Sequence, residues 1–217
     1  VLHVVKPRYP LPLDPEFFIG RISADTLIDM GYRDGWDYLA QRQPGGVAHD
    51  ATCTAMTQPL RGVRFTERLR GEIDGSDLTL QVTVELPLPR DGTSPGARLV
   101  GHVDYQPWGE RVLLADGRVS VDGPAIIYRA RVLVDGAWLP VVARRELVDD
   151  RGFDAWADMR TVEFSVGSLS GTLRFGVLDA GRTLASLEPV GTHGFTDRKR
   201  ALAYLAELGL RRAFETY

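Results

Sequence analysis

The stretch from about Arg64 to Val190 alternates apolar and polar residues with a period of two, and this alternation constrains the fold more than any other feature. The segments RFTERLRGEI and LTLQVTVEL show it clearly, and the breaks between such segments are rich in Gly, Asp and Pro. This pattern is typical of antiparallel strands with one buried and one solvated face. A long series of such strands tends to curl into a barrel or sandwich that encloses an apolar interior.

About nine strands can be delimited in this way, the last of them at TLASLEPV. The dipeptides Asp74-Gly75 and Asp135-Gly136 are typical of tight hairpin turns. A helix is expected from Thr196 to about Phe214. We therefore expect a mainly β fold, an antiparallel up-and-down barrel of eight to nine strands with a C-terminal helix. Its layout resembles that of the lipocalin-like calycins, and a likeness of fold carries no function by itself.

Residues 1–60 have a different character, with a short strand, LHVV, then a proline-rich stretch, a helix and a linker. The helix is predicted from about Ser23 to Gln41, with Ser23 as its N-cap. We expect two units, an N-terminal strand-helix segment with its linker over residues 1–60 and the barrel over 61–217. The face on which the helix packs is predicted to hold Leu27, Ile28, Gly31 and Leu39.

Charge and composition exclude several classes of protein. The net charge of −3 lacks the basic excess expected of a nucleic-acid-binding domain, so no nucleic-acid partner is predicted. The single cysteine, Cys53, permits no internal disulfide and fits a reducing compartment. We expect a cytoplasmic protein, and the alternative is a protein peripherally associated with a membrane. Because the chain begins with Val1 in an apparent strand, we expect a piece of a longer polypeptide.

Glu67 is the most unusual residue of the predicted barrel, because the alternation places it on the same face as Phe65 and Leu69. A carboxylate on an apolar face costs several kcal/mol unless it is paired, by rough estimate. One interpretation is a ligand anchor or a general base. The other is a structural ion pair with Arg144 or a neighbouring arginine, or a bulge that turns Glu67 outward.

Large aromatic residues on or beside the strands, Trp108, Trp138, Trp156 and Tyr128, are candidates to line a cavity for a sterol or acyl chain. The alternative is ordinary packing of the core and its rim. Arg144 and Glu146 share a face of one strand, so an ion pair between strands is the default interpretation for them. The predicted ligand-binding residues are Glu67, Tyr128, Trp108, Trp156 and Arg144.

Other polar motifs are incomplete as catalytic or metal sites. His102 and Asp104 share a strand face that we expect to be exposed to solvent, and no nucleophile accompanies them. His49 and Cys53 lack further ligands at a suitable spacing. The stretch GSLSG is not a nucleophile elbow, because Leu169 occupies the position of the serine. No catalytic residue, metal ligand or cofactor is predicted.

Three longer segments resemble a bacterial accessory β-domain: GVRFTERLRGEI, ARLVGHVDYQPWGERVLLADGRVSV and IIYRARVLVDGAWLPVVARRELVDDRGFDAWADMRTVEF. The family motifs correspond to Phe65-Thr66-Glu67 with Gly71, and to the acidic segment DDRGFDAW that ends at Trp156. The resemblance covers about residues 62–165 and, more weakly, the chain to Tyr217. Such domains accompany cholesterol-oxidase-like oxidoreductases or α/β-hydrolases, which implies an accessory role.

Residues 1–42 resemble the C-terminal end of a patatin-like acyl hydrolase. The resemblance rests on VLHVVKPRY, followed by SADTLIDMGYRDGWDYL with its Gly31-Tyr32 pair, Asp34 and Gly35. The catalytic serine and aspartate of that family would lie before Val1, so no catalytic role is transferred to this sequence. Together the two resemblances imply an upstream catalytic domain as a partner.

Three functions from different classes follow from the sequence. The preferred one is a non-catalytic accessory module that binds a fatty acyl chain or a sterol. The second is a docking or structural domain, with a homo-oligomer as the expected assembly. The third is a small barrel isomerase or cyclase that acts on a hydrophobic substrate with Glu67 and Tyr128.

Overall fold

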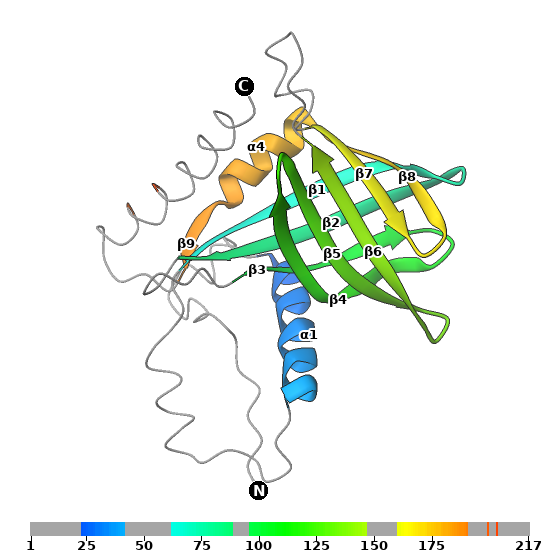
Figure 1. Ribbon diagram of the computed structural model, residues 1–217, viewed down its shortest axis with the longest axis horizontal. Coiled ribbons are helices and arrows are strands. Elements are labelled where there is room, and N and C mark those ends of the chain that lie inside the picture. Colours follow the sequence, from blue (N-terminus) through cyan, green and yellow to red (C-terminus); the bar gives the residue numbers. More distant parts are fainter. Residues whose placement is uncertain are drawn as a thin grey trace, which may run out of the picture.

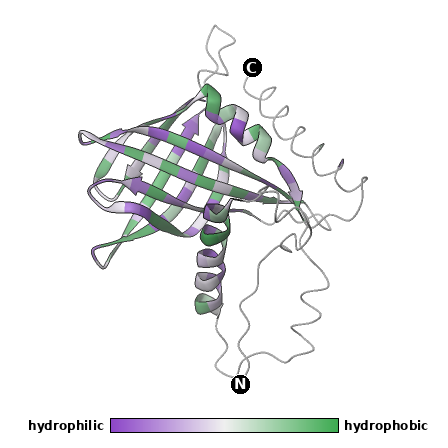
Figure 2. Cartoon of the chain, turned by 180° about the vertical axis from the view of Figure 1, so that it is seen from behind, coloured by the Kyte–Doolittle hydropathy of each residue, from purple (hydrophilic) through white to green (hydrophobic). Residues whose placement is uncertain are grey.

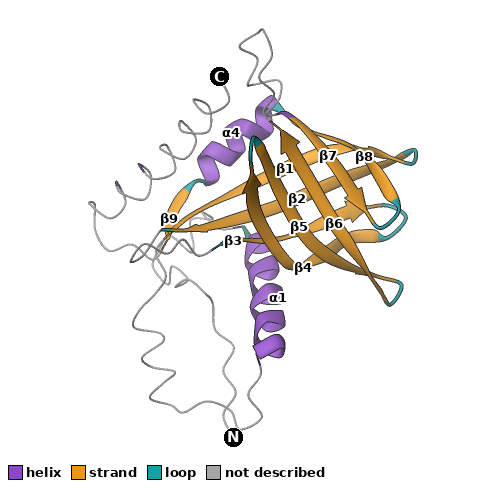
Figure 3. Ribbon diagram, in the orientation of Figure 1, coloured by secondary structure: helices purple, strands orange, loops and turns teal. Residues whose placement is uncertain are grey.

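The computed structural model describes residues 23–41, 62–88, 96–146 and 160–190, together with residues 199 and 203. Apart from residues 199 and 203, these residues form two helices and nine strands, which Figure 3 distinguishes by colour. The elements are α1 (Ala24–Gln41), β1 (Gly62–Ile73), β2 (Ser76–Pro87), β3 (Ala97–Tyr105), β4 (Gly109–Asp122), β5 (Ala125–Val134), β6 (Ala137–Glu146), β7 (Thr161–Val166), β8 (Leu169–Phe175), α4 (Val177–Ser186) and β9 (Glu188–Val190).

The strands β1 to β8 form a closed barrel (Figure 1). Each strand pairs antiparallel with the next along the chain, and β8 returns to pair with β1 through Leu69 and Phe175. The short β9 extends the same sheet beside the start of β1, where Gly62 lies opposite Val190. The predicted up-and-down, lipocalin-like barrel is therefore confirmed.

Alternation of the side chains places an apolar core inside the barrel, as the period of two predicts. Figure 2 shows hydrophobic and hydrophilic residues alternating along the strands. On β5, for example, Tyr128, Ala130 and Val132 are buried, whereas Arg129 and Arg131 are exposed. Members of the core from the other strands include Leu69, Leu80, Val103, Val141, Phe164 and Leu173.

Two of the hairpin turns have the conformation that their Asp-Gly sequences predict. Asp74 and Gly75 have φ angles of 51° and 73°, and Asp135 and Gly136 have φ angles of 48° and 77°. Both positions of such a turn require positive φ, which Asp tolerates and Gly adopts without strain. These turns set the pairing of β1 with β2 and of β5 with β6.

The segment TLASLEPV is not a single strand, which corrects the prediction. Its first half belongs to α4, and only Glu188–Val190 pairs with β1 as β9. Thr183 and Ser186, three residues apart, both contact Thr66: Thr183 Oγ1 donates to the Thr66 carbonyl oxygen at 2.8 Å, and the Thr66 backbone N–H donates to Ser186 Oγ at 2.8 Å. Residues three apart share a helix face, so these polar contacts on β1 favour a helix over the alternating pattern of a strand.

Polar contacts also attach the first turn of α4 to β1. The buried Asp179 accepts a hydrogen bond from Arg70 Nη1 at 3.1 Å. In contrast, the apolar side chains Val177, Leu178 and Leu184 of this helix are exposed.

The predicted strand LHVV lies outside the described residues, and of the predicted helix after Thr196 only residues 199 and 203 are described, both helical.

The helix α1 packs against the outer faces of β3 and β4. Its N-cap is Ser23 as predicted, because the Thr26 backbone N–H donates to Ser23 Oγ at 3.1 Å. The predicted packing face is wrong, since Ile28 and Leu39 are more than half exposed. The helix instead buries a largely polar face against the barrel, made of Thr26, Asp29, Met30 and Arg33.

Close approach of β1 and β8 requires glycine at position 71. A Cβ atom there would overlap the Thr172 carbonyl oxygen and the Leu173 side chain. We expect Gly71→Ala to lower the free energy of unfolding by about 1–3 kcal/mol, the usual cost of overpacking, as measured by urea denaturation. The control is Gly35→Ala on α1, where a Cβ atom meets nothing within 4 Å, and it should stabilise the protein by up to about 1 kcal/mol. Equal effects of the two variants would contradict the strand-closure role of Gly71.

Candidate functional site

A polar cluster of three residues, Glu67, Tyr128 and Arg145, lies buried inside the barrel. Tyr128 Oη donates a hydrogen bond to Glu67 Oε2 at 2.9 Å, and Arg145 Nη1 donates to Glu67 Oε1 at 3.2 Å. The residues come from β1, β5 and β6, and each occupies an inward position of the alternation. The predicted structural ion pair of Glu67 is thus confirmed, with Arg145 as the neighbouring arginine that supplies it.

The cluster lies toward the end of the barrel at which β6 and β8 finish. Arg145 is the second-last residue of β6, and Phe175 is the last residue of β8. The guanidinium carbon of Arg145 lies 5.4 Å from the centre of the Phe175 ring, in cation–π contact. Among the described strands, Glu67 and Arg145 are the charged residues at inward positions. The other inward residues of these described strands are apolar apart from tyrosine hydroxyl groups.

Burial raises the pKa of Tyr128 well above its usual range, and the neighbouring Glu67 carboxylate raises it further. Tyr128 therefore remains a protonated donor at any physiological pH. Burial alone lowers the pKa of Arg145, but its interactions with Tyr128 and Glu67 outweigh this effect and leave the pKa raised. The cluster is accordingly a fixed arrangement of one neutral donor, Tyr128, and one ion pair, Glu67 with Arg145.

Two donor atoms of Arg145 have no hydrogen-bond partner in this arrangement of described residues. Its Nε and Nη2 atoms are buried and have no hydrogen-bond partner among the described residues. A buried donor without a partner costs about 1–3 kcal/mol. The sequence could have indicated Arg145, because it follows Val141 and Ala143 on the inward face of β6. The prediction named Arg144 as the partner of Glu67 and left a neighbouring arginine as the alternative.

The other predicted ligand-binding residues are distributed differently. Arg144 faces outward and pairs with Glu146 of its own strand at 3.2 Å. The prediction of an ion pair between strands is therefore wrong, and so is the prediction that Arg144 binds a ligand inside the barrel. Trp108 lies in the β3–β4 turn, half-buried against the core, with its ring 4.9 Å from that of Tyr105. Trp156 lies outside the described residues. Of the predicted set, the structure brings together Glu67 and Tyr128.

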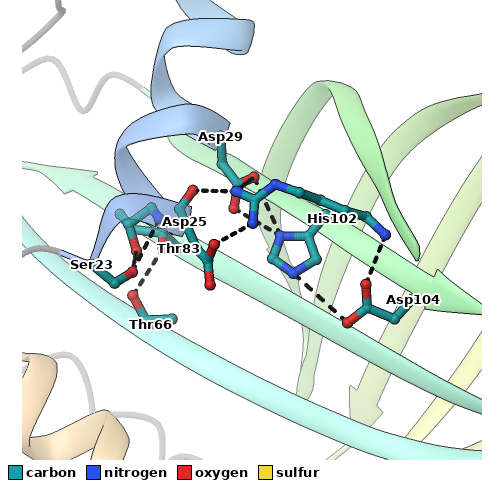
Figure 4. A network of polar contacts seen from close by, with 9 residues as sticks. Ser23, Asp25, Asp29, Thr66, Thr83, His102 and Asp104 are labelled. Carbon is teal, nitrogen blue, oxygen red and sulfur yellow. Dashed lines mark hydrogen bonds and ion pairs between the residues drawn. The ribbon is translucent and has the colours of Figure 1, made fainter.

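A second polar cluster fastens α1 to the barrel (Figure 4). His102 Nδ1 lies 3.0 Å from Asp29 Oδ2, so this ring nitrogen carries a proton. Arg111 Nη2 donates to Asp29 Oδ1 at 3.1 Å, and the other terminal nitrogen of Arg111 pairs with Asp25. The Arg111 backbone N–H donates to Asp104 Oδ1 at 2.8 Å. Charges from α1, β3 and β4 therefore meet in one network.

The network corrects the prediction that His102 is exposed. The residue does point outward from β3, but α1 covers it and leaves 5% of its surface exposed. Its Nε2 atom faces Asp104 Oδ2 at 3.9 Å. The described partners of His102 are carboxylates, and this arrangement supports packing of the helix against the barrel.

Arg98 of β3 makes a second attachment for α1. Its Nη2 atom lies 2.6 Å from Asp34 Oδ1 and 3.3 Å from Asp37 Oδ2, and its Nη1 atom lies 3.5 Å from Glu85 Oε2. Burial raises the pKa of Asp34, although the hydrogen bond from Arg98 opposes the rise. Sequence reasoning missed these aspartates, and their signal was the series of acids along one helix, Asp25, Asp29, Asp34 and Asp37.

Further classes of site receive no support from the part of the chain that the structure describes. It holds no group of three or more His, Cys, Asp or Glu residues that could bind a metal ion. None of its helices has the length and hydropathy needed to cross a membrane. Of the GSLSG stretch, Gly167 and Ser168 form the turn between β7 and β8, and the remaining residues begin β8. His49 and Cys53 lie outside the described residues.

Comparisons with models of known protein families, with curated proteins and with solved structures found no match for this chain. A barrel of this kind hosts many unrelated functions, so the fold alone assigns none. Function therefore has to be inferred from the two polar clusters and the interior.

Removing the charge of Glu67 should leave Arg145 as an uncompensated buried cation. We expect Glu67→Gln to lower the free energy of unfolding by about 3–5 kcal/mol. The double variant Glu67→Gln/Arg145→Met should recover most of this loss, because it removes both charges. The control is Arg144→Ala, which breaks an exposed pair and should cost less than about 1 kcal/mol. Urea denaturation of the wild type and these three variants measures these effects, and a double variant no more stable than Glu67→Gln would contradict the pairing.

The polar cluster under α1 predicts a local effect. Asp29→Asn should detach α1 from the barrel, because Arg111 and His102 lose their shared buried acceptor. Trp36 of α1, which lies 5.2 Å from the Trp138 ring, should then shift its fluorescence to longer wavelength. The β-sheet signal in circular dichroism should remain. Asp25→Asn is the matched control, because that carboxylate is largely exposed and its loss should cost less than about 1 kcal/mol. A fluorescence shift of the same size in the control would argue against Asp29 as the anchor.

Proposed function

We propose that this chain is a non-catalytic module that binds one hydrophobic small molecule inside its barrel. The observation that carries the proposal is the buried cluster of Glu67, Tyr128 and Arg145 within an otherwise apolar interior. Ligand sites typically combine apolar walls with a few convergent polar groups that orient the ligand. An eight-stranded barrel has the size that holds either its own side chains or one small ligand.

The proposed setting is a larger lipid-metabolising polypeptide of bacterial type. Its support is the resemblance of residues 62–165 to accessory β-domains and of residues 1–42 to the end of patatin-like acyl hydrolases. In this setting the module would hold a fatty acyl chain or a sterol beside an upstream catalytic domain. A cytoplasmic protein, alone or peripheral to a membrane, fits that role.

The geometry favours binding over catalysis at this cluster. Both carboxylate oxygens of Glu67 are engaged, one by Tyr128 and the other by Arg145. A general base needs an oxygen within reach of a substrate proton. The isomerase or cyclase alternative therefore has less support than a site that holds and orients a ligand.

One observation favours the docking alternative. Three apolar residues of α4, Val177, Leu178 and Leu184, are between 61% and 80% exposed. As a docking surface they predict a homo-oligomer that forms with rising protein concentration. Light scattering of the wild-type chain and of Leu178→Asp tests this function, and a monomer at every concentration would rule it out.

The binding proposal predicts saturable uptake of one ligand per chain. Methyl oleate and cholesterol are the probes, and isothermal titration calorimetry is the measurement. Ala143→Leu enlarges an inward residue that lies opposite Tyr128 and Phe164, and should weaken binding by about tenfold or more. Val142→Leu enlarges the neighbouring outward residue and should leave affinity unchanged. Absence of saturable binding, or equal affinity of the two variants, would contradict binding inside the barrel.

A further inference from the structure

The two free donors of Arg145 define the chemistry of a ligand more narrowly than the fold does. The Nε–H and Nη2–H bonds lie on one edge of the planar guanidinium and point the same way, so one acceptor group can take both. The side chain that carries them is 2% exposed. An acceptor delivered to this edge would satisfy donors that have no partner among the described residues.

The charge of Arg145 is already balanced. Glu67 Oε1 lies 3.2 Å from Arg145 Nη1, on the other side of the guanidinium carbon from the free edge. A ligand carboxylate at that edge would add a second anion to the buried interior, where desolvation is costly and Glu67 repels it. A neutral oxygen acceptor makes the same hydrogen bonds without that repulsion.

The surroundings of the edge fit an apolar molecule with a single polar atom. Phe175 lies against the guanidinium, and Leu69 pairs with Phe175 across β1 and β8. Farther along the barrel interior the inward residues are apolar, among them Val141 of β6 and Phe164 of β7. A ligand that is mostly hydrocarbon with one hydrogen-bonding atom at its end therefore complements the barrel interior, which is mostly apolar with one free guanidinium edge toward its end.

Building on the function proposed above, we propose that Arg145 binds the carbonyl oxygen of a neutral lipid through Nε–H and Nη2–H. The ligand class is an acyl ester or a sterol ketone, and not a free fatty acid. Glu67 and Tyr128 act as positioning residues, since they hold the guanidinium with its free edge toward the ligand.

The test compares five probes with the full chain: methyl oleate, oleate, 1-octadecene, cholest-4-en-3-one and cholestane. We expect each carbonyl compound to bind about tenfold or more tightly than its matching hydrocarbon, and oleate to bind more weakly than methyl oleate. A larger preference for the carbonyl compound in the oleyl series identifies the ester as the source of the carbonyl. A larger preference in the sterol series identifies the ketone.

Arg145→Lys is the decisive variant, because lysine keeps a cation for Glu67 but lacks the two-donor edge. It should reduce the preference for a carbonyl over a hydrocarbon to less than about threefold, with hydrocarbon affinity retained. Arg144→Lys, the outward neighbour, is the matched control and should keep the full preference. If Arg145→Lys does not fold, the infrared band of 13C-labelled methyl oleate bound to the wild type decides, since a hydrogen-bonded carbonyl absorbs at lower wavenumber.

The outcomes separate this inference from the proposed function. Equal binding of carbonyl compounds and hydrocarbons, tightest binding of oleate, or an unshifted carbonyl band overturns the inference while binding inside the barrel stands. Failure of all five probes to bind overturns both. A carbonyl preference that survives Arg145→Lys places the acceptor elsewhere and also overturns the inference.

Discussion

Strand β1 closes the barrel, because it pairs with β2 along one edge and with β8 and β9 along the other. The register that achieves closure also fixes which side chains of β1 face inward, since a shift of one residue would exchange the two faces. Glu67 is therefore inside because Leu69 and Phe65 are. Once it is there, the interior has to supply a cation and a donor, and Arg145 and Tyr128 do so.

The sequence predicted the features of the fold that are local. Alternation predicted that Glu67 shares a face of β1 with Phe65 and Leu69, and Asp-Gly dipeptides predicted two turns, because both depend on neighbouring residues. It did not predict that Arg145, and not Arg144, reaches Glu67. The two partners are 78 residues apart, and buried arginine is rare enough that a charge run is normally interpreted as solvated.

The packing of both helices escaped prediction for a related reason. An apolar stripe is the usual sign of the face that a helix buries, yet α1 buries Asp29 and Arg33, and α4 buries Asp179. The outer strand faces that receive them carry His102, Arg98 and Arg70, so complementary charge takes the place of apolar contact. Such complementarity becomes visible only when strands and helices are placed side by side.

Because α1 is attached through polar contacts, we expect its local stability to be lower than the stability of the barrel. The buried apolar cluster inside the barrel consists of strand residues, so α1 can leave the outer wall without uncovering that cluster. Opening of that helix exposes charged groups that water solvates well, whereas opening of the barrel exposes the core. Amide hydrogens of α1 should consequently exchange with solvent by local unfolding of the helix, whereas those of β1 should exchange only by global unfolding of the barrel.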